Sequence, residues 1–454
     1  MVEKLWSILN KVTAEYADIR HETKNETRIA LNGKELTELG SNATDGYVLR
    51  VLHKGGFSSV AFTTYDDHEK AIATATENAH LMSRFTTQPV VFATTQVVKD
   101  HYVPLLDEDP RKVTMDEKLQ LTRKYNAIAL DHDKIATTNI AYVETTREKN
   151  FVSTEGSEIH EELMTARISG LITSREGNLI QNIRVAAGGS HGFAILRDRE
   201  DDFERKMRIA VELLTAQPIK GGRSNVIVNQ SMGGVFTHEA FGHFSEADII
   251  ENNRSMRQKM QIGAMLGSEI VSITDDPTLP NQLGHYRYDD EGVAACRSSL
   301  LKDGMLVGRL HSRRTAAAFQ EPVNGHCVAE DYRYGPIIRM GTIFIEPGKD
   351  TFDGLLDRLG DGFYILDAKG GQTSGENFTF GAQYGYEVKN GKVGAMVRDI
   401  NISGNLYNTL KNIVAVGDDL RLGQVGGCGK GQMNIRSCHG SPHLIISNLV
   451  IGGV

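Results

Sequence analysis

Two histidines and a glutamate lie close together in the segment Thr237-His238-Glu239-Ala240-Phe241-Gly242-His243. Two imidazoles on one side of a helix can bind a divalent metal ion, and a carboxylate beside the first can take a proton from a water bound to that ion. The residue types therefore predict a metal-dependent hydrolase, in which His238 and His243 are ligands and Glu239 is the base.

The spacing of this segment, H-E-x-x-x-H, is one residue longer than the H-E-x-x-H of common zinc peptidases. In a regular α-helix, side chains five positions apart point about 140° away from each other and cannot face one ion. A π-turn restores the two rings to one side, and such turns occur mostly at functional sites. We therefore predict a π-turn, with Gly242 where distortion costs least because glycine lacks a Cβ. The alternative is that His238 and His243 are unrelated histidines of an amphipathic helix.

A third protein ligand is needed, because catalytic zinc takes three from the protein and leaves one position for water. Cys428 is the strongest candidate, since the glycines around it in Gly426-Gly427-Cys428-Gly429-Lys430-Gly431 allow a tight turn and Lys430 is placed to favour the thiolate. The alternatives close to the motif are three carboxylates, which are otherwise expected to be a solvated face beyond the helix: Glu246, Asp248 and Glu251.

The elements that must position these residues belong to a chain of 454 residues, which suggests two or three domains. With 40% hydrophobic and 24% charged residues, it is typical of a soluble globular protein. Helices are expected over residues 3–16, 66–83, 114–131 and 200–216, with Thr114 and Glu117 as a capping box. Strands are expected within residues 28–62 and 134–196, with turns at Asn32-Gly33 and Gly55-Gly56.

Pro218 and Gly221-Gly222 mark a domain boundary, so we predict an N-terminal domain over residues 1–218 and a C-terminal domain over 219–454. Asn225 to Val228 is predicted to be a buried strand that leads into the motif helix, with Ser231 as its cap. Apart from a helix over 351–359, the rest is β-like and rich in glycine. The predicted fold class is α+β, with a mixed N-terminal domain of antiparallel strands and a C-terminal antiparallel sheet or partly closed barrel.

The net charge of −8 argues against a broad phosphate-binding surface, so direct nucleic-acid binding is not expected. Residues 1–11 have no signal-peptide pattern, and no apolar run approaches the length of about 20 residues that spans a bilayer. We expect a cytoplasmic protein without membrane contact. The four cysteines have no disulfide-like spacing and are expected to be thiols or ligands: Cys296, Cys327, Cys428 and Cys438.

Several of these motifs together resemble the TldD branch of the TldD/PmbA family. The order and spacing match over essentially the whole chain, and the motifs that carry the resemblance are Thr237 to His243, Tyr288-Asp289-Asp290-Glu291-Gly292, Asn324-Gly325-His326, Pro336-Ile337-Ile338-Arg339-Met340, and Gly427-Cys428-Gly429-Lys430 with Gln432.

The resemblance implies a zinc-dependent peptidase that forms dimers and acts on small or unfolded peptides, among them the leader of a peptide antibiotic and a labile antitoxin. It places the Zn²⁺ ligands on His238, His243 and Cys428 and the catalytic role on Glu239, all four of which are present. The PmbA-like (TldE) branch lacks the motif. One departure is Cys438-His439 shortly after Cys428, which provides an alternative donor.

Three hypotheses follow for the function. The first is the peptidase, working as a homodimer or with a PmbA-like (TldE) subunit, with its site in an enclosed cavity between subunits. The second is a non-enzymatic partner or regulator of the gyrase-modulator type, a label this family often carries, with an empty or structural metal site. The third is a metal-dependent amidase for small molecules, although an edge strand in the C-terminal half would favour peptides. A donor that stabilises the oxyanion is also required, and four residues are candidates: His311, His326, Tyr332 and Arg333.

Overall fold

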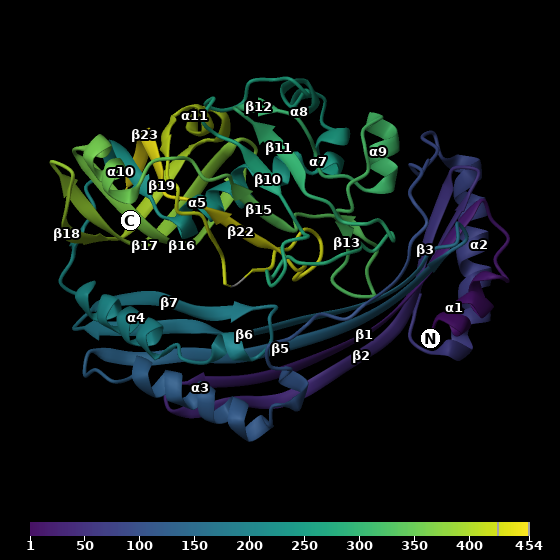
Figure 1. The fold of residues 1–454 in the computed structure, drawn as a ribbon, viewed down its shortest axis with the longest axis horizontal. Helices are drawn as coiled ribbons and strands as arrows, with labels where there is room; N and C mark the ends of the chain where they lie inside the picture. The colour runs from purple at the N-terminus through teal and green to yellow at the C-terminus, as the bar shows by residue number, and fades with distance from the viewer. Residues whose placement is uncertain (425, 453–454) are drawn as a thin grey trace.

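The computed structural model of the chain describes residues 1–424 and 426–452. The fold is α+β, as predicted, and Figure 1 shows two parts: a long sheet below, and the later part of the chain above it. Among the described residues, no helix is both long enough and apolar enough to cross a membrane.

The long sheet has seven strands in the order β3-β2-β1-β5-β6-β4, with β7 beside β6. All neighbours are antiparallel except β4 and β6. The strands are β1 (Tyr16–Asn32), β2 (Glu35–His53), β3 (Gly56–Phe62), β4 (Lys99–Tyr102), β5 (Ile135–Ser153), β6 (Glu158–Glu176) and β7 (Leu179–Gly189). Both predicted glycine turns are confirmed, because Gly33 and Gly55 have φ of 56° and 78° and connect β1 to β2 and β2 to β3.

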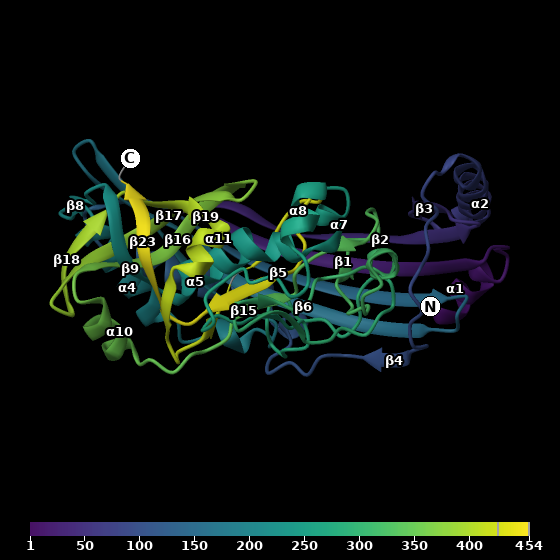
Figure 2. The same cartoon turned by 90° about the horizontal axis from the view of Figure 1, so that it is seen from above.

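Helices cover this sheet in two places. α1 (Val2–Leu9) and α2 (His68–Phe85) pack near β3, at one end of the strands in Figure 2, where Leu5, Ile8 and Ala75 meet Ile19 and Leu49. α3 (Met115–Ala129) and α4 (Glu200–Glu212) pack Tyr125 and Phe203 against a second core. Of the capping box predicted at Thr114 and Glu117, the structure shows one half: the Thr114 side chain caps α3 by accepting a hydrogen bond from the Glu117 backbone. The first helix ends at Leu9 and is shorter than expected.

The later part of the chain contains an eight-stranded sheet that closes partly on itself. β16 pairs with both β9 and β17, so that β16, β9, β23, β19 and β17 form a ring, which confirms the predicted partly closed barrel. The strands are β8 (Gln217–Pro218), β9 (Gly222–Val228), β16 (Gly362–Ser374), β17 (Asn377–Lys389), β18 (Lys392–Arg398), β19 (Ile400–Asn405), β20 (Ile413–Val416) and β23 (Leu444–Gly452). β8 lies before the predicted boundary but already pairs in this sheet. We propose that the boundary between the two domains lies near residue 218.

A six-stranded sheet in the order β12-β11-β10-β15-β22-β21 lies beside it. Its strands are β10 (Ile273–Asp275), β11 (Ser298–Lys302), β12 (Met305–Leu306), β15 (Thr342–Ile345), β21 (Arg421–Leu422) and β22 (Cys438–Ser441), and a small pair is formed by β13 (Cys327–Val328) and β14 (Ile337–Ile338). The remaining helices are α5 (Gln230–Val235), α6 (His243–Ser245), α7 (Ala247–Glu251), α8 (Arg254–Lys259), α9 (Arg313–Phe319), α10 (Phe352–Leu359) and α11 (Leu406–Lys411), with 3₁₀ turns at Tyr65–Asp67, Pro110–Lys112 and Ala194–Leu196. One large core joins both sheets to the motif helix.

Candidate metal centre

The motif lies on a helix that starts directly after the buried strand β9. Asn229, not Ser231 as predicted, caps this helix, because its side-chain oxygen accepts a hydrogen bond from the Met232 backbone at 3.0 Å. The helix continues from α5 into a π-helical segment, Phe236–Gly242, and then into α6. The predicted π-turn is therefore present, and it brings the rings of His238 and His243 to 5.3 Å between centroids.

Gly242 has a different role from the one expected of it. Its φ of −55° is ordinary for a helix, so the π-turn does not depend on glycine's backbone freedom here. A Cβ at this position would instead lie 2.1 Å from Sδ of Met340 and 3.0 Å from the end of Ile343. Glycine thus allows the motif helix to approach β15 and the residues before it.

Four predicted side chains converge at this point. His238, Glu239, His243 and Cys428 each place a ligand atom within 4.8 Å of the others. Sγ of Cys428 lies 3.6 Å from Nε2 of His243, and Oε2 of Glu239 lies 3.6 Å from the same nitrogen. His238 is only 3% exposed, whereas the carboxylate of Glu239 is one-third exposed and accessible to solvent. The arrangement offers three soft or borderline donors and one partly solvated carboxylate.

Cys428 lies on a hairpin, where it exchanges two backbone hydrogen bonds of 3.0 Å with Ile435. Lys430 fixes this hairpin to the motif helix. Its Nζ lies 2.8 Å from Glu246 Oε2 and 2.9 Å from Asp248, and it donates to the Ile338 carbonyl at 2.9 Å. Lys430 therefore contacts carboxylates, and not the thiolate that the sequence suggested.

Glu246 is fully buried, so the prediction of a solvated face is wrong for this residue. Its carboxylate lies 3.0 Å from Nη1 of Arg339 and 3.5 Å from Nδ1 of His243. Although burial raises the pKa of Glu246, its bonds with His243, Arg339 and Lys430 hold that pKa below its usual value. A carboxylate on the far nitrogen of an imidazole fixes the ring and its tautomer. The i to i+3 spacing from His243 was the available signal for this contact.

The other two carboxylates beyond the motif are engaged elsewhere. Asp248 bonds to Lys430, and Glu251 forms a bidentate pair with Arg314 at 2.7 and 2.8 Å. Neither belongs to the group of converging ligand atoms.

The two motif histidines have opposite electrostatic environments. Burial, together with His439, His243 and Arg339, lowers the pKa of His238 well below its usual value. Burial also lowers the pKa of His243, but its bonds with Cys428, Glu239 and Glu246 outweigh that effect and raise the pKa to about 11. The ring of His238 is therefore neutral, whereas that of His243 would have to lose a proton before it could bind a metal.

Cys438 and His439, the alternative donors, lie on β22 beside the site. Cys438 is buried, its thiol contacts the Gly423 carbonyl at 3.3 Å, and burial raises its pKa to about 11. The His439 ring lies 5.5 Å from that of His238, and burial lowers its pKa to about 4. Both fall outside the converging group.

The four candidate oxyanion donors have other contacts. His311 bonds to Glu321 and Thr315, and His326 bonds to Asp275. Arg333 forms an ion pair with Asp331, and the Tyr332 ring packs where Gly46 leaves room for it. None of the four belongs to the converging group, whereas the ring of His439 lies next to that of His238.

Three domains of one known family match this chain. Residues 221–453 match the C-terminal domain of the PmbA/TldA metallopeptidases, residues 108–217 match their central domain, and residues 17–82 match their domain 1. A metalloprotease from Synechocystis sp. is 32% identical over 97% of this chain and 95% of its own length. A metalloprotease from Methanothermobacter thermautotrophicus is 33% identical, with coverage of 97% and 96%.

The fold and the sequence define a metallopeptidase. The chain belongs to the PmbA/TldA (TldD) metallopeptidase family, as the resemblance implied. A zinc metalloprotease TldD homolog from Saccharolobus solfataricus is 26% identical over 97% of both chains.

Two solved structures share the fold over nearly the whole chain. A proposed modulator of a DNA gyrase from Thermotoga maritima has a TM-score of 0.81 and 21% identity, and covers 99% of both chains. TldE from Thermococcus kodakarensis has a TM-score of 0.80 and 16% identity, and covers 100% of this chain and 99% of its own. The arrangement of a long sheet beneath a partly closed barrel is thus a shared architecture.

Proposed function

We propose that the protein is a zinc-dependent peptidase that hydrolyses small or unfolded peptides, with His238, His243 and Cys428 as zinc ligands and Glu239 as the base. The observation that carries the proposal is the convergence of these four side chains, one of them from a hairpin 185 residues away, within 4.8 Å. Chance neighbours on one helix would not bring Cys428 to the same point.

The donor set fits zinc. Two imidazoles and a thiolate are ligands that zinc accepts in tetrahedral sites with one position left open. Nδ1 of His238 is buried and has no hydrogen-bond partner in the described part of the chain, and binding of a cation by this ring would offset the cost of burying it. When bound, zinc would act as the Lewis acid for the peptide carbonyl and the attacking water.

The protein's own residues transfer the proton, position the ligands and stabilise the carbonyl oxygen. Glu239 takes a proton from the attacking water as the water oxygen bonds to the carbonyl carbon. The carbon–nitrogen bond then breaks, and Glu239 passes that proton to the leaving amine. Glu246 and Lys430 hold the ring of His243 and the hairpin of Cys428 in place. We place His439, beside His238, as the donor to the carbonyl oxygen.

An extended peptide is the substrate that suits this part of the fold. β21 is one of the two edge strands of the six-stranded sheet, and the chain leads from it into the Cys428 hairpin. A free edge offers main-chain hydrogen bonds to an added strand, which favours peptides over small amides. We further propose that the protein works as a dimer, with a second copy or a PmbA-like (TldE) subunit, around an enclosed site.

The decisive experiment combines metal analysis with a Glu239→Gln variant. Protein purified without added zinc should contain about one zinc per chain, lost on Cys428→Ser. Glu239→Gln should keep its zinc and lower kcat on an unstructured peptide by about 100- to 10,000-fold. Unchanged cleavage would remove Glu239 from the mechanism. A protein that binds no zinc and cleaves no peptide would instead be the non-enzymatic partner.

A further inference from the structure

A second hollow borders the Cys428 hairpin, between the long sheet and the later part of the chain. It measures about 950 Å³ including its open mouth, and both Gly426 and Ile435 line it. Ile435 is the backbone partner of Cys428, so this hollow and the candidate metal centre share one hairpin. The hollow has an open mouth and is larger than an inorganic ion requires.

One wall of the hollow is apolar and the other is formed by a sheet face. Leu163, Tyr286, Val328 and Ile435 form a small core cluster along it. From the sheet, alternate residues of β1, β5 and β6 point to the same face, which brings several basic side chains together: Lys24, Arg147, Lys149 and Arg167. Arg436, from beyond the hairpin, adds a fifth cation.

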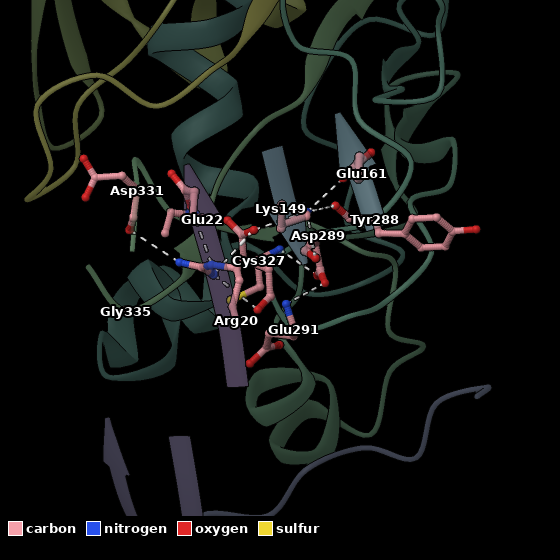
Figure 3. A network of polar contacts seen from close by, with 12 residues as sticks. Arg20, Glu22, Lys149, Glu161, Tyr288, Asp289, Glu291, Cys327, Asp331 and Gly335 are labelled. Atoms are coloured by element: carbon pink, nitrogen blue, oxygen red, sulfur yellow. Dashed lines mark hydrogen bonds and ion pairs between the residues drawn. The ribbon is translucent and has the colours of Figure 1, made fainter. Parts of the chain in front are cut away.

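Two of these cations are neutralised by a buried ionic network. Arg147 lies 2.6 Å from Glu22 and 3.2 Å from Asp290, and Lys149 lies 2.9 Å from Glu161. Figure 3 shows this network, with Lys149 close to Glu161 and to the loop that carries Tyr288 and Asp289. The charges of Arg147 and Lys149 are therefore already balanced by carboxylates of the protein.

The other three cations, Lys24, Arg167 and Arg436, have no carboxylate within 4.0 Å in the described part of the chain. Among the described residues, Arg167 donates only to the Gly426 carbonyl, at 3.4 Å. Arg436 donates to two carbonyls and to Ser190, and its Nε is buried without a partner. Burial lowers the pKa of both arginines, to about 10 for Arg436.

The hollow also contains two acidic groups besides those of the ionic network. Glu330 accepts hydrogen bonds from the backbone of Met433 and Asn434, at 2.7 and 3.2 Å, and so holds the hairpin. Glu26 lies on β1 and lines the same sheet face as Lys24, and its charge raises the pKa of Arg167 without outweighing the effect of burial. No ion pair within 4.0 Å joins Glu26 to Arg167 in the described residues. Half-buried guanidinium groups without a counter-ion are costly unless an anion arrives.

We infer that this hollow binds a carboxylate of the peptide substrate, with Arg167 and Lys24 as its recognition residues and the apolar wall covering the neighbouring substrate side chains. The carboxylate is an acidic side chain or the C-terminal group. This inference rests on the proposed peptidase function and names its substrate class. Binding energy gained away from the cleaved bond would then position that bond at the metal centre.

The test compares ten-residue unstructured peptides that differ only in charge: one with an internal Asp, one with Asn in its place, and each with a free or amidated C-terminus. Zinc-loaded wild type, Arg167→Gln, Lys24→Gln and the control Arg184→Gln are used, because Arg184 is exposed on the same sheet and does not line the hollow. Wild type should prefer one carboxylate about ten- to hundredfold in kcat/KM. Arg167→Gln should abolish that preference while leaving zinc content and cleavage of the neutral peptide unchanged.

The outcomes separate the two proposals. Loss of preference on amidation assigns the C-terminal group, and loss on Asp→Asn assigns the side chain. No preference in wild type, or a preference that survives Arg167→Gln, overturns the inference while leaving the peptidase intact. If no peptide is cleaved, the peptidase proposal fails, and the binding inference is tested by fluorescence anisotropy of the labelled acidic peptide with wild type and Arg167→Gln. Weaker binding to Arg167→Gln than to wild type supports the inference. Equal binding, or no binding to either protein, overturns it.

Discussion

Lys430 and Glu246 form an ion pair of 2.8 Å that joins the hairpin of Cys428 to the helix of His243. The same carboxylate contacts Nδ1 of His243, so a single buried group positions two of the three proposed ligands. The pair therefore holds the proposed ligands in position without being a ligand itself. Its removal should lower the affinity for metal more than it lowers the rate of the metal-loaded protein.

Lys430→Met should weaken zinc binding about 10- to 100-fold, since partners of this kind usually contribute that much affinity. The affinity is measured by competition with a chromophoric chelator. Lys389→Met is the matched control, because Lys389 is exposed and pairs only with Glu387 at the surface. Equal zinc affinity in both variants would show that the hairpin holds its position without Lys430.

Gly242→Ala should lower both stability and zinc affinity, because the added Cβ collides with Met340. Overpacking of this kind costs about 1–3 kcal/mol. Removing the obstacle should restore both properties, so Gly242→Ala with Met340→Ala should bind zinc better than Gly242→Ala alone. Urea unfolding and zinc titration of the four proteins complete the cycle, and additive losses would contradict the steric explanation.

Zinc binding should release a proton from His243. Its pKa is raised to about 11, so below that pH the metal-free protein holds the proton that zinc must displace. Affinity should therefore rise with pH, about tenfold per unit for this one proton, and fall on acidification. Calorimetry at pH 7 in buffers of different ionisation enthalpy counts the released protons. Because the thiol of Cys428 can also release one, ¹⁵N NMR of the metal-free protein identifies the source, and a neutral His243 ring at pH 7 would contradict the prediction.

His439→Ala should lower kcat about 10- to 100-fold while leaving zinc content and KM nearly unchanged, if its ring donates to the carbonyl oxygen. Because burial lowers the pKa of His439 to about 4, the ring is neutral between pH 6 and 8, and the loss should be the same across that range. His132→Ala is the control, since His132 is exposed. A loss of zinc in His439→Ala would assign this residue to the metal.

The sequence predicted the features that depend on neighbouring residues. The π-turn at His238 to His243, the cap at Thr114, the helix over 351–359 and the turn at Gly33 each need only a few consecutive positions. β1 was only partly predicted. Its central residues, from Glu22 onward, do not show the alternation of apolar and polar side chains that identifies a strand, because they face buried charges and the hollow.

The support of the candidate centre could not be predicted in this way. Arg339 and Lys430 reach Glu246 from 93 and 184 residues away, and no local pattern links them. The need for glycine at position 242 could not be predicted either, because the collision that it avoids involves Met340, a residue distant in sequence. Such contacts depend on how the two later sheets pack around the motif helix.

The order of the ligands along the chain has a consequence for synthesis. Cys428 follows His243 by 185 residues, and β22, next to the motif helix, comes later still. A ribosome-bound chain that already displays both histidines lacks the thiolate and the lysine that anchors it. The proposed hydrolytic site therefore stays incomplete throughout most of translation. In this mechanism the growing polypeptide, itself unfolded, is not exposed to its own protease.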